Sequence, residues 1–441
     1  MPIQDNKSLS IQLRHLLPFW AAFFLSPFLW PYIHNTAEAF ALLAFATGLA
    51  AAAAMWEPVW GRKWSAGREG ALPWLWVICV LLPGFVLLLL NQARDPWGVW
   101  HQSLFIAASC LVFIFARAHA FRLFITREWV LLLAIVAHLY GIYAFMQWFG
   151  IRPFEPLLAD TLFQFWSHAK VQNLAGPLAQ ENLHGLFLCL VLIAVFSRVV
   201  DASSSRWWPW WLLSLLPAVN LLGTGSRGSF IVFSLGVVAL VFVSPFRRQA
   251  IIRVFSALLL AALLYWLLYE LWSSDASSLS GQNGKTLVQA FQQKGVSARL
   301  FIWDLSLRLY MEHPWLGVGL GNLASYGAEG HTLTLQAHPE WADRVLYVQH
   351  TLAHSTPLQF FVEAGLIGGV AVLALYGLVF FRVIQLLRQG RSLSDGLLQG
   401  ALGSGLILMH GLVSVSGSNA FFMVMFALYA AAAFPCRVND V

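Results

Sequence analysis

The sequence predicts an all-α polytopic membrane protein with about 12 transmembrane helices and one large, partly helical loop on the outer side of the membrane. Three observations support this prediction. Hydrophobic residues make up 59% of the 441 residues and charged residues only 10%, whereas soluble domains contain about 25% charged residues. The mean hydropathy is +0.69. The charged residues gather between long apolar runs, and one polar stretch, 273-355, separates two groups of such runs.

The apolar runs have the length that a membrane-spanning helix needs, about 20 residues. Only helices are expected, because a spanning segment must satisfy its own backbone hydrogen bonds. The predicted spans lie at residues 16-33, 36-56, 71-90, 100-117, 128-149, 181-200, 208-223, 228-245, 251-272, 356-384, 395-416 and 418-434. The chain thus divides into the first nine helices over 1-272, the polar loop over 273-355 and the last three helices over 356-441.

The distribution of Lys and Arg predicts the orientation of these helices. Seventeen of the 26 basic residues fall in the two terminal segments and in every second connection between spans, and short loops rich in Lys and Arg remain cytoplasmic. Both termini are therefore predicted to be cytoplasmic, with the 273-355 loop facing outward. The formal charge of +6 follows from this asymmetry, so membrane lipids and not nucleic acid are the expected surroundings.

The cysteines and acidic residues do not predict a metal site. Cys79, Cys110 and Cys189 lie inside apolar runs and Cys436 lies in the tail, which indicates neither a disulfide framework nor a zinc site. The outward segments contain no paired carboxylates, no His-Glu-x-x-His motif and no phosphate-binding loop motif. We expect neither a metal nor a cofactor.

One arginine lies where an outward loop turns into a helix. Arg227 directly precedes an apolar run, among glycines and hydroxyl side chains that include Ser226 and Gly228. A cation is electrostatically disfavoured at a helix N-terminus, whereas the free N–H groups there bind anions. The setting favours an anionic ligand such as a phosphate. The alternative is an arginine that anchors the helix among lipid headgroups.

A second arginine opens an amphipathic helix in the polar loop. Arg299 lies in the first turn of this helix, which is predicted to run to about Glu312 and to stop at His313-Pro314. One apolar stripe at helical spacing consists of Leu300, Trp303, Leu307 and Met311. A second stripe, whose charges are expected to pair, consists of Asp304, Arg308 and Glu312. Arg299 has no acidic residue three or four positions away, which leaves a distant partner or an ordinary solvated charge as the alternatives.

A histidine precedes the helix that follows the polar loop. Thr356-Pro357-Leu358-Gln359 predicts an N-cap threonine, a proline in the first turn and a glutamine that completes a capping box. His354 then lies just outside a helix N-terminus, whose dipole keeps the imidazole neutral near pH 7. A neutral imidazole can act as a general base. His350 competes for this role, and an interfacial histidine bonded to a carbonyl is the alternative for either residue.

Two acidic residues near the starts of predicted spans receive structural predictions. Glu181 favours the dipole of its own helix. Glu363 lies about two turns into the span after His354, where an acid is costly without a partner. It is expected to orient another group or to pair with an arginine.

Together these segments resemble the O-antigen ligase and polymerase superfamily of bacterial membrane glycosyltransferases. The resemblance rests on three motifs: Gly225-Ser226-Arg227-Gly228; Arg299 with Trp303, followed by Pro314-x-x-Gly317-x-Gly319-x-Gly321-Asn322; and His354-Ser355-x-x-x-Gln359-x-x-x-Glu363-x-Gly365-Leu366-Ile367-Gly368. It covers residues 220 to 370. The N-terminal third matches only as a string of hydrophobic spans.

The resemblance implies a reaction and a location. The protein is expected to act as an O-antigen ligase, a transferase that moves a glycan from undecaprenyl diphosphate to a sugar hydroxyl of lipid A-core in lipopolysaccharide biosynthesis. The reaction is expected to be inverting and metal-independent, at the periplasmic face of the bacterial inner membrane. Arg227, Arg299 and His354 match the residues that are essential in O-antigen ligases. Candidate substrate contacts are Ser226, Gly228, Trp303, Asn322, His350 and Gln359.

Several alternatives remain open in the sequence. An O-antigen polymerase or a protein O-oligosaccharyltransferase of the same superfamily is the alternative enzyme. The latter usually carries a further periplasmic region that is expected to be missing here, and Ser355 stands where related enzymes often have asparagine, which leaves the acceptor open. A transporter for lipid-linked sugars is the alternative of another class, although few charged residues lie within spans and no repeat is visible.

Overall fold

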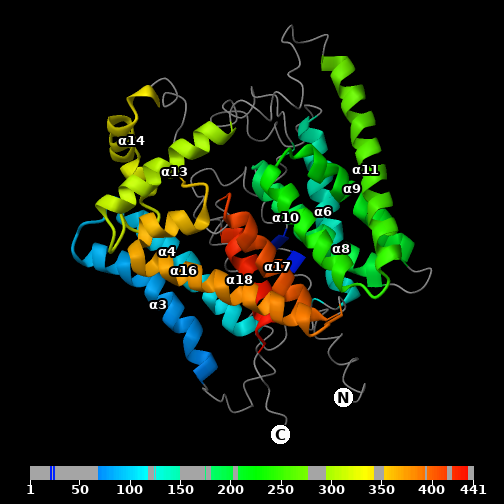
Figure 1. Cartoon of the computed structure of the whole chain (residues 1–441), viewed down its shortest axis with the longest axis horizontal. Helices are drawn as coiled ribbons and strands as arrows, with labels where there is room; N and C mark the ends of the chain where they lie inside the picture. The colour runs from blue at the N-terminus through cyan, green and yellow to red at the C-terminus, as the bar shows by residue number, and fades with distance from the viewer. Residues whose placement is uncertain are drawn as a thin grey trace.

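The computed structural model describes residues 20-21, 23-24, 68-117, 124, 126-148, 174, 180-201, 207-276, 295-341, 352-392, 395-414 and 420-435. These residues form helices and connecting turns only (Figure 1). A helix is found at every predicted span from 71-90 onward. The predicted spans 16-33 and 36-56 lie outside the described residues except at positions 20, 21, 23 and 24.

The helix bounds follow the predicted spans closely. Before the polar loop lie α3 (Arg68–Leu89), α4 (Pro96–Ala116), α6 (Arg127–Trp148), α8 (Glu181–Asp201), α9 (Trp208–Gly223), α10 (Arg227–Val243) and α11 (Arg247–Ala276). The loop itself contains α13 (Gly295–Glu312), η7 (Leu323–Tyr326), α14 (Gly327–Ala337) and η8 (Pro339–Trp341). After it come α16 (Thr356–Arg388), α17 (Gly396–Gly411) and α18 (Ala420–Ala433).

The described helices have the composition of a membrane protein. Five stretches are long and apolar enough to cross a bilayer: Pro96–Ile114, Arg127–Trp148, Glu181–Val200, Arg247–Glu270 and Thr356–Arg388. Shorter apolar helices lie at Ile78–Leu89, Arg227–Val243 and Phe421–Ala433. The described part of this membrane protein is therefore all-helical, while the number of spans stays a prediction.

The helices form two groups that meet at α17. One group consists of α6, α9, α10 and α11 around α8, which is almost wholly buried. The other consists of α3, α4, α16 and α18. α17 packs against α16 and α18 on one side and against α10 and α8 on the other (Figure 1). Residues near the ends of α10 and α16 are thereby brought together.

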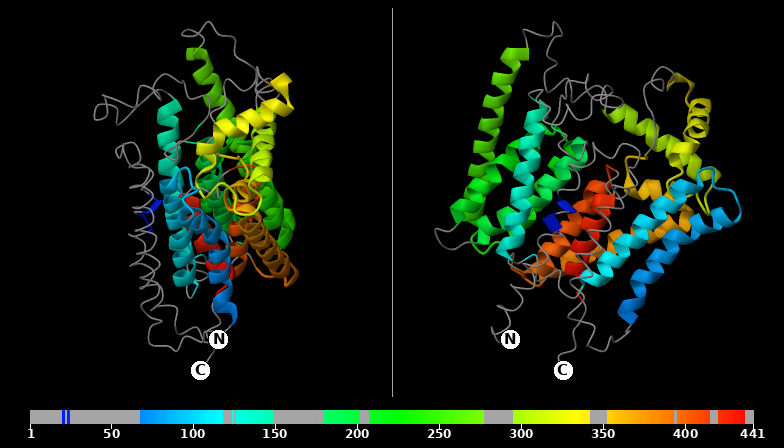
Figure 2. Two further views of the ribbon diagram at one scale, coloured as in Figure 1. Left: turned by 90° about the vertical axis from the view of Figure 1, so that its left-hand side faces the viewer. Right: turned by 180° about the vertical axis from the view of Figure 1, so that it is seen from behind.

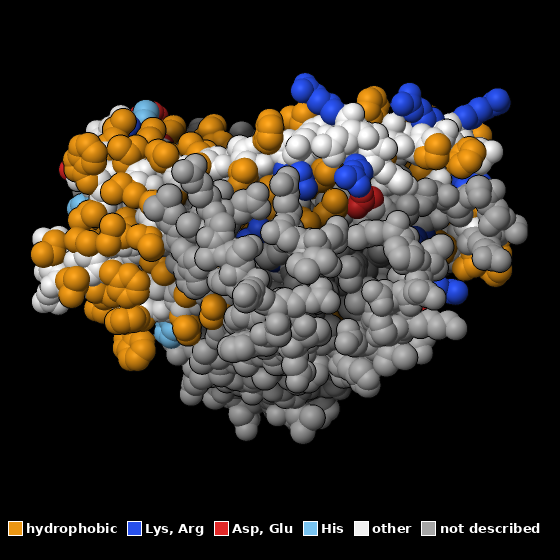
Figure 3. Space-filling model, turned by 90° about the horizontal axis from the view of Figure 1, so that it is seen from below, with side chains coloured by type: hydrophobic (Ala, Val, Ile, Leu, Met, Phe, Trp, Pro, Cys, Tyr) orange, Lys and Arg blue, Asp and Glu red, His pale blue; other side chains and the backbone are white. Residues whose placement is uncertain are grey.

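Basic side chains gather at one side of the molecule. Lys and Arg are concentrated along one part of the face seen from below (Figure 3). Arg198, at the end of α8, donates to the Thr126 carbonyl (3.3 Å), and Arg253 of α11 donates to the Val199 carbonyl (3.0 Å). α13 and α14 lie on the opposite, upper side (Figure 2). Which of the two sides is cytoplasmic stays a prediction.

The helix predicted in the polar loop is present as α13, and it ends at Glu312 directly before His313-Pro314. Three members of its predicted apolar stripe face outward: Leu300 is 50% exposed, Leu307 44% and Met311 67%. The fourth, Trp303, is half-buried. The core side of α13 is formed by Phe301, Leu305 and Leu309, which pack with Val318, Leu323 and Val362. Helical spacing is compatible with both stripes, and only the neighbouring elements decide which one is covered.

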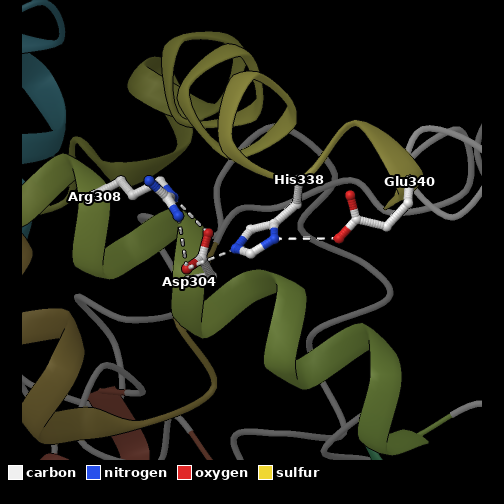
Figure 4. A network of polar contacts seen from close by, with 4 residues as sticks. All are labelled: Asp304, Arg308, His338 and Glu340. Carbon is white, nitrogen blue, oxygen red and sulfur yellow. Dashed lines mark hydrogen bonds and ion pairs between the residues drawn. The ribbon is translucent and has the colours of Figure 1, made fainter.

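The charged stripe of α13 forms the pair that its spacing predicts. Arg308 Nε lies 2.6 Å from Asp304 Oδ2. His338 lies between Asp304 (3.9 Å) and Glu340 (3.3 Å), as Figure 4 shows. These partly exposed contacts connect α13 to the segment after α14, and contacts of this kind contribute at most about 1 kcal/mol each.

Candidate active site

α16 is broken near its start, and residues 314-322, called the glycine loop below, fill the break. Gly365 has φ 64° and ψ −162° inside the helix, a conformation that is almost restricted to glycine. Three backbone hydrogen bonds join the two segments: Val318 N–H to Val362 C=O (2.8 Å), Gly319 N–H to Glu363 C=O (2.9 Å) and Leu366 N–H to Pro314 C=O (2.8 Å). Two motifs that lie apart in the sequence are therefore one structural unit.

Glu363 holds this unit together from inside. Its side chain is 2% exposed, and its carboxylate accepts hydrogen bonds from the backbone N–H groups of Gly321 and Leu323. It also accepts from Gln359 Nε2 (3.0 Å). A buried acid needs such donors. The contacts show the orienting role that was one of the two expectations for Glu363.

Gln359 extends this chain of contacts to His354. Its Oε1 accepts the backbone N–H of Ala353 at 3.1 Å, so both ends of the amide are used within the protein. His354 itself has φ 50°, in the left-handed region, which costs a non-glycine residue about 1 to 3 kcal/mol. The contacts between Glu363, Gln359 and Ala353 hold the chain in this turn. Gln359 therefore positions His354, while a direct substrate contact of Gln359 stays a prediction.

The predicted capping box at the start of α16 is wrong by one position. The N-cap is Ser355, not Thr356, and its side chain makes no capping hydrogen bond. Gln359 reaches past the N-cap to Ala353. The left-handed turn at His354 directs the chain away from the helix axis before the N-cap, and the sequence pattern around Thr356 and Pro357 contains no sign of that turn.

Arg227, Arg299 and His354 lie within electrostatic range of one another. Burial, and then the positive charge of Arg227, lower the pKa of Arg299. Burial, and then the positive charge of Arg299, lower the pKa of His354. Charges shift each other's pKa in this way only at short range. Residues from α10, α13 and the start of α16 therefore meet in one place.

The electrostatics of this place favour an anion. Arg227 and Arg299 carry like charges, and Arg299 forms no ion pair with any acidic side chain in the described part of the chain. Arg227 is the first residue of α10, where the helix dipole adds further positive potential. Two partly buried guanidiniums at a helix start provide a fork geometry that suits phosphate oxygens. The lowered pKa of His354 keeps its imidazole neutral at pH 7.

Ser226 and Gly228 fix the start of α10 against neighbouring helices. Ser226 is the N-cap, its Oγ donates to Asn182 Oδ1 (2.7 Å) and it lies 2.8 Å from Ser229 Oγ. A Cβ on Gly228 would lie 3.0 Å from Val413 Cγ2. These contacts orient Arg227. The predicted substrate contacts of Ser226 and Gly228 stay predictions.

His410 belongs to the same cluster, and sequence reasoning missed it. It lies near the end of α17, fully buried, with Nε2 3.3 Å from Ser229 Oγ. It is close enough to Arg299 for the two groups to interact electrostatically. A histidine inside a predicted span is rare and usually faces the bundle interior. That signal was present at position 410 and could have identified it.

The other predicted contacts have different surroundings. Asn322 is fully buried; its Oδ1 accepts Asp95 N–H (2.6 Å) and its Nδ2 donates to Asp95 C=O (3.1 Å), which anchors the glycine loop to the start of α4. Trp303 lies one turn after Arg299, and its indole N–H is buried with no partner among the described residues. His350 lies outside the described residues. Glu181 begins α8, as its predicted dipole role requires.

Thiols and possible metal ligands are dispersed in the described part of the chain. Cys79, Cys110 and Cys189 are free. The described residues include no group of three or more His, Cys, Asp or Glu side chains that could hold a metal ion.

Comparison with known proteins identifies the segment that carries this cluster. Residues 212–373 match the family model described as O-antigen ligase. A search of curated proteins found no match to the chain. The matched segment includes Arg227, Arg299, His354, the glycine loop and Glu363. The resemblance that the sequence motifs predict is confirmed: over residues 212–373 this membrane protein is similar to the O-antigen ligase family.

Proposed function

We propose that the protein is an O-antigen ligase that transfers a glycan from undecaprenyl diphosphate to a sugar hydroxyl of lipid A-core. The observation that supports this most directly is the cluster of two like-charged guanidiniums beside a neutral imidazole. The cluster calls for a multiply charged anion and, next to it, for a hydroxyl that gives its proton to the imidazole. A lipid-linked diphosphate and a sugar hydroxyl supply both partners.

Arg227 and Arg299 bind the diphosphate in this proposal. When the anomeric carbon–oxygen bond breaks, negative charge grows on the departing diphosphate oxygen. Preorganised charged donors stabilise that growing charge more than they stabilise the ground state. The buried hydrogen bonds of Ser226 and the glycine loop keep the guanidiniums and His354 in place before substrate arrives.

His354 acts as the general base. Its neutral imidazole takes the proton of the acceptor hydroxyl, the acceptor oxygen forms the new bond to the anomeric carbon, and undecaprenyl diphosphate leaves from the opposite face. The configuration is therefore inverted, and no metal is required because the diphosphate is already a good leaving group. A positioned base contributes about 100-fold to 10,000-fold. Trp303, one turn after Arg299, contacts the glycan through its ring in this proposal.

The proposal includes the membrane orientation. The side with α13 and α14 faces the periplasm of a bacterium, the basic side faces the cytoplasm, and both termini are cytoplasmic. Residues 1-272 and 356-441 form the membrane part, with about 12 spans in total. Residues 273-355 form the periplasmic loop that carries Arg299 and His354.

The dependence of the reaction on pH tests the role of His354. The pKa of His354 is lowered from its ordinary value near 6.5, and only the unprotonated ring accepts a proton. The transfer rate is expected to stay constant as the pH falls to 6.5 and to decline below that value. In Arg299→Gln, whose residual rate is low, the pH at which the decline begins should move upward, because one of the two causes of the lowered pKa is removed. A decline that begins above pH 7 in the wild-type protein would contradict the assignment.

A reconstituted reaction tests the function itself. Purified protein in lipid nanodiscs is mixed with undecaprenyl-diphosphate-linked glycan and lipid A-core, with EDTA and without nucleotide. A glycan ladder on lipid A-core supports ligation. Growth of the donor glycan alone identifies a polymerase, transfer to a protein acceptor identifies an oligosaccharyltransferase, and movement of donor across liposomes without a new bond identifies a transporter.

A further inference from the structure

A large apolar cavity lies between α4, α16, α17 and α18, and one of its ends is next to the start of α16. Its volume is ≈ 890 Å³. Most of its lining is apolar, with Phe113, Leu375, Val379, Leu408, Phe426 and Phe434 among the residues that form it. The charged residues in its wall are Arg117 and Arg382. The cavity thus combines an apolar interior with two positive charges.

The cavity has the depth of one membrane leaflet. Its lining runs from Ile106 to Arg117 along α4 and, after the break in α16, from Ala371 to Arg382, which corresponds to about 17 Å of helix at about 1.5 Å per residue. Thr356 and Phe360, before the break, also line it. The hydrocarbon core of a bilayer is about 30 Å thick. Thr356 lines the opposite end, and Tyr376 is also part of the wall. Both side chains approach Gly411, because a Cβ on Gly411 would lie 2.7 Å from Tyr376 Oη and 3.0 Å from Thr356 Oγ1. The two arginines are therefore at one end of the cavity, and the start of α16 is at the other.

Both arginines are held in place at the end of α18. Arg117 Nε donates to Phe434 C=O (2.8 Å) and Arg382 Nε to Ala433 C=O (3.0 Å). Arg382 Nη1 also donates to Gln385 Oε1 (2.9 Å). A guanidinium has more N–H donors than these bonds use. Arg382 interacts electrostatically with one acidic residue, Asp395. Asp395 is itself paired with Arg391 (3.1 Å). The two guanidiniums thus present N–H groups to an anion.

We propose that this cavity binds one anionic glycerophospholipid, with the phosphate between Arg117 and Arg382 and the acyl chains in the interior. A group of the size of a water molecule or a methylene occupies about 30 Å³, so the cavity has room for about 30 such groups. This number is close to the number of carbon atoms in two acyl chains. In the proposed orientation the lipid comes from the cytoplasmic leaflet, whose anionic lipids attract basic groups. The site is separate from the diphosphate site, since Arg227 and Arg299 lie beside His354, beyond the Thr356 end of the cavity.

Lipid binding by the full-length protein tests this proposal without reference to catalysis. Detergent-purified protein is titrated with phosphatidylglycerol or with phosphatidylcholine of identical chains, and bound lipid is counted by native mass spectrometry. The wild-type protein is expected to retain one phosphatidylglycerol in preference to phosphatidylcholine. Arg117→Gln and Arg382→Gln are each expected to weaken that binding about tenfold or more, because each removes charge-assisted hydrogen bonds. Arg388→Gln, an exposed arginine outside the cavity wall, serves as the matched control.

Loss of an arginine could weaken lipid binding indirectly, by disturbing α18, and a second variant separates this effect from loss of the site. Ala374→Phe adds volume to the cavity wall and leaves both arginines unchanged, so it should also reduce retention of phosphatidylglycerol while the unfolding temperature of the lipid-free protein stays constant. Equal retention of the two lipids, or unchanged binding in Ala374→Phe, would overturn the proposal. One-for-one displacement of phosphatidylglycerol by undecaprenyl phosphate would overturn it as well, since the cavity would then hold the polyprenyl tail of the donor.

Discussion

Replacement of Arg299 by alanine is expected to reduce the rate of glycan transfer by about 100-fold to 1000-fold, the usual loss when one preorganised donor to a developing anion is removed. Arg299 lies close to Arg227 and His354 and has no acidic partner among the described residues. Its charge is therefore available to the departing diphosphate. Initial rates with purified protein, at equal amounts of folded enzyme, measure the effect.

Two further variants separate this role from that of an ordinary surface charge. Arg308→Ala removes an arginine of the same helix that is paired with Asp304, and a partly exposed pair contributes at most about 1 kcal/mol, so its rate should change less than about fivefold. Arg299→Lys keeps the charge but loses the planar fork, and an intermediate loss is expected. If Arg299→Ala and Arg308→Ala lose activity equally, the assignment of Arg299 to the diphosphate is wrong.

Replacement of Gly365 by alanine is expected to destabilise the protein by about 3 kcal/mol or more, a loss typical of strain at a special backbone conformation. A Cβ at this position would lie 2.1 Å from the Trp315 carbonyl oxygen and 2.4 Å from its carbonyl carbon. The positive φ and extended ψ of Gly365 also exclude a side chain. Relief of the clash separates the glycine loop from α16 and breaks the contacts that hold His354. Chemical unfolding in detergent, together with transfer activity, measures both consequences.

The same helix offers a matched control for this prediction. A Cβ on Gly377 would meet nothing within 4 Å, so Gly377→Ala is expected to be neutral or to stabilise the helix by up to about 1 kcal/mol. A common loss of stability in both variants would show that α16 tolerates no substitution in general. It would contradict the specific role assigned to the break at Gly365.

The helices themselves could be predicted because their signals are local. Each apolar run is long enough to satisfy its own backbone hydrogen bonds in the membrane, and α13 ends where His313-Pro314 interrupts its pattern. The ion pair between Asp304 and Arg308 follows from a separation of four residues. Arg227 lies at the start of α10 because an apolar run begins directly after it. None of these features depends on a distant part of the chain.

The sequence could not decide the structure wherever a segment was compatible with two local arrangements. The outward stripe and the core stripe of α13 both have helical spacing, and the choice between them depends on Val318 and Val362. The pattern from Ser355 to Gln359 is compatible with more than one cap, and the left-handed turn at His354 selects the observed one. The substrate contact of Asn322 stays a prediction, but the sequence did not show that its amide bonds to Asp95, which precedes it by 227 positions.

The sequence by itself was enough to predict an all-helical membrane protein and a helix in the polar loop. It was also enough to single out Arg227, Arg299 and His354 as candidate site residues. It could do so because hydropathy, helical period and motif order are read along the chain. Only the tertiary structure decided that the glycine loop fills the break in α16, that Gln359 and Glu363 hold the turn at His354, and that His410 joins the cluster. The physical reason is that broken helices leave backbone N–H and C=O groups that must be paired, and the partners that pair with them come from distant segments that only the packing of the helices brings near.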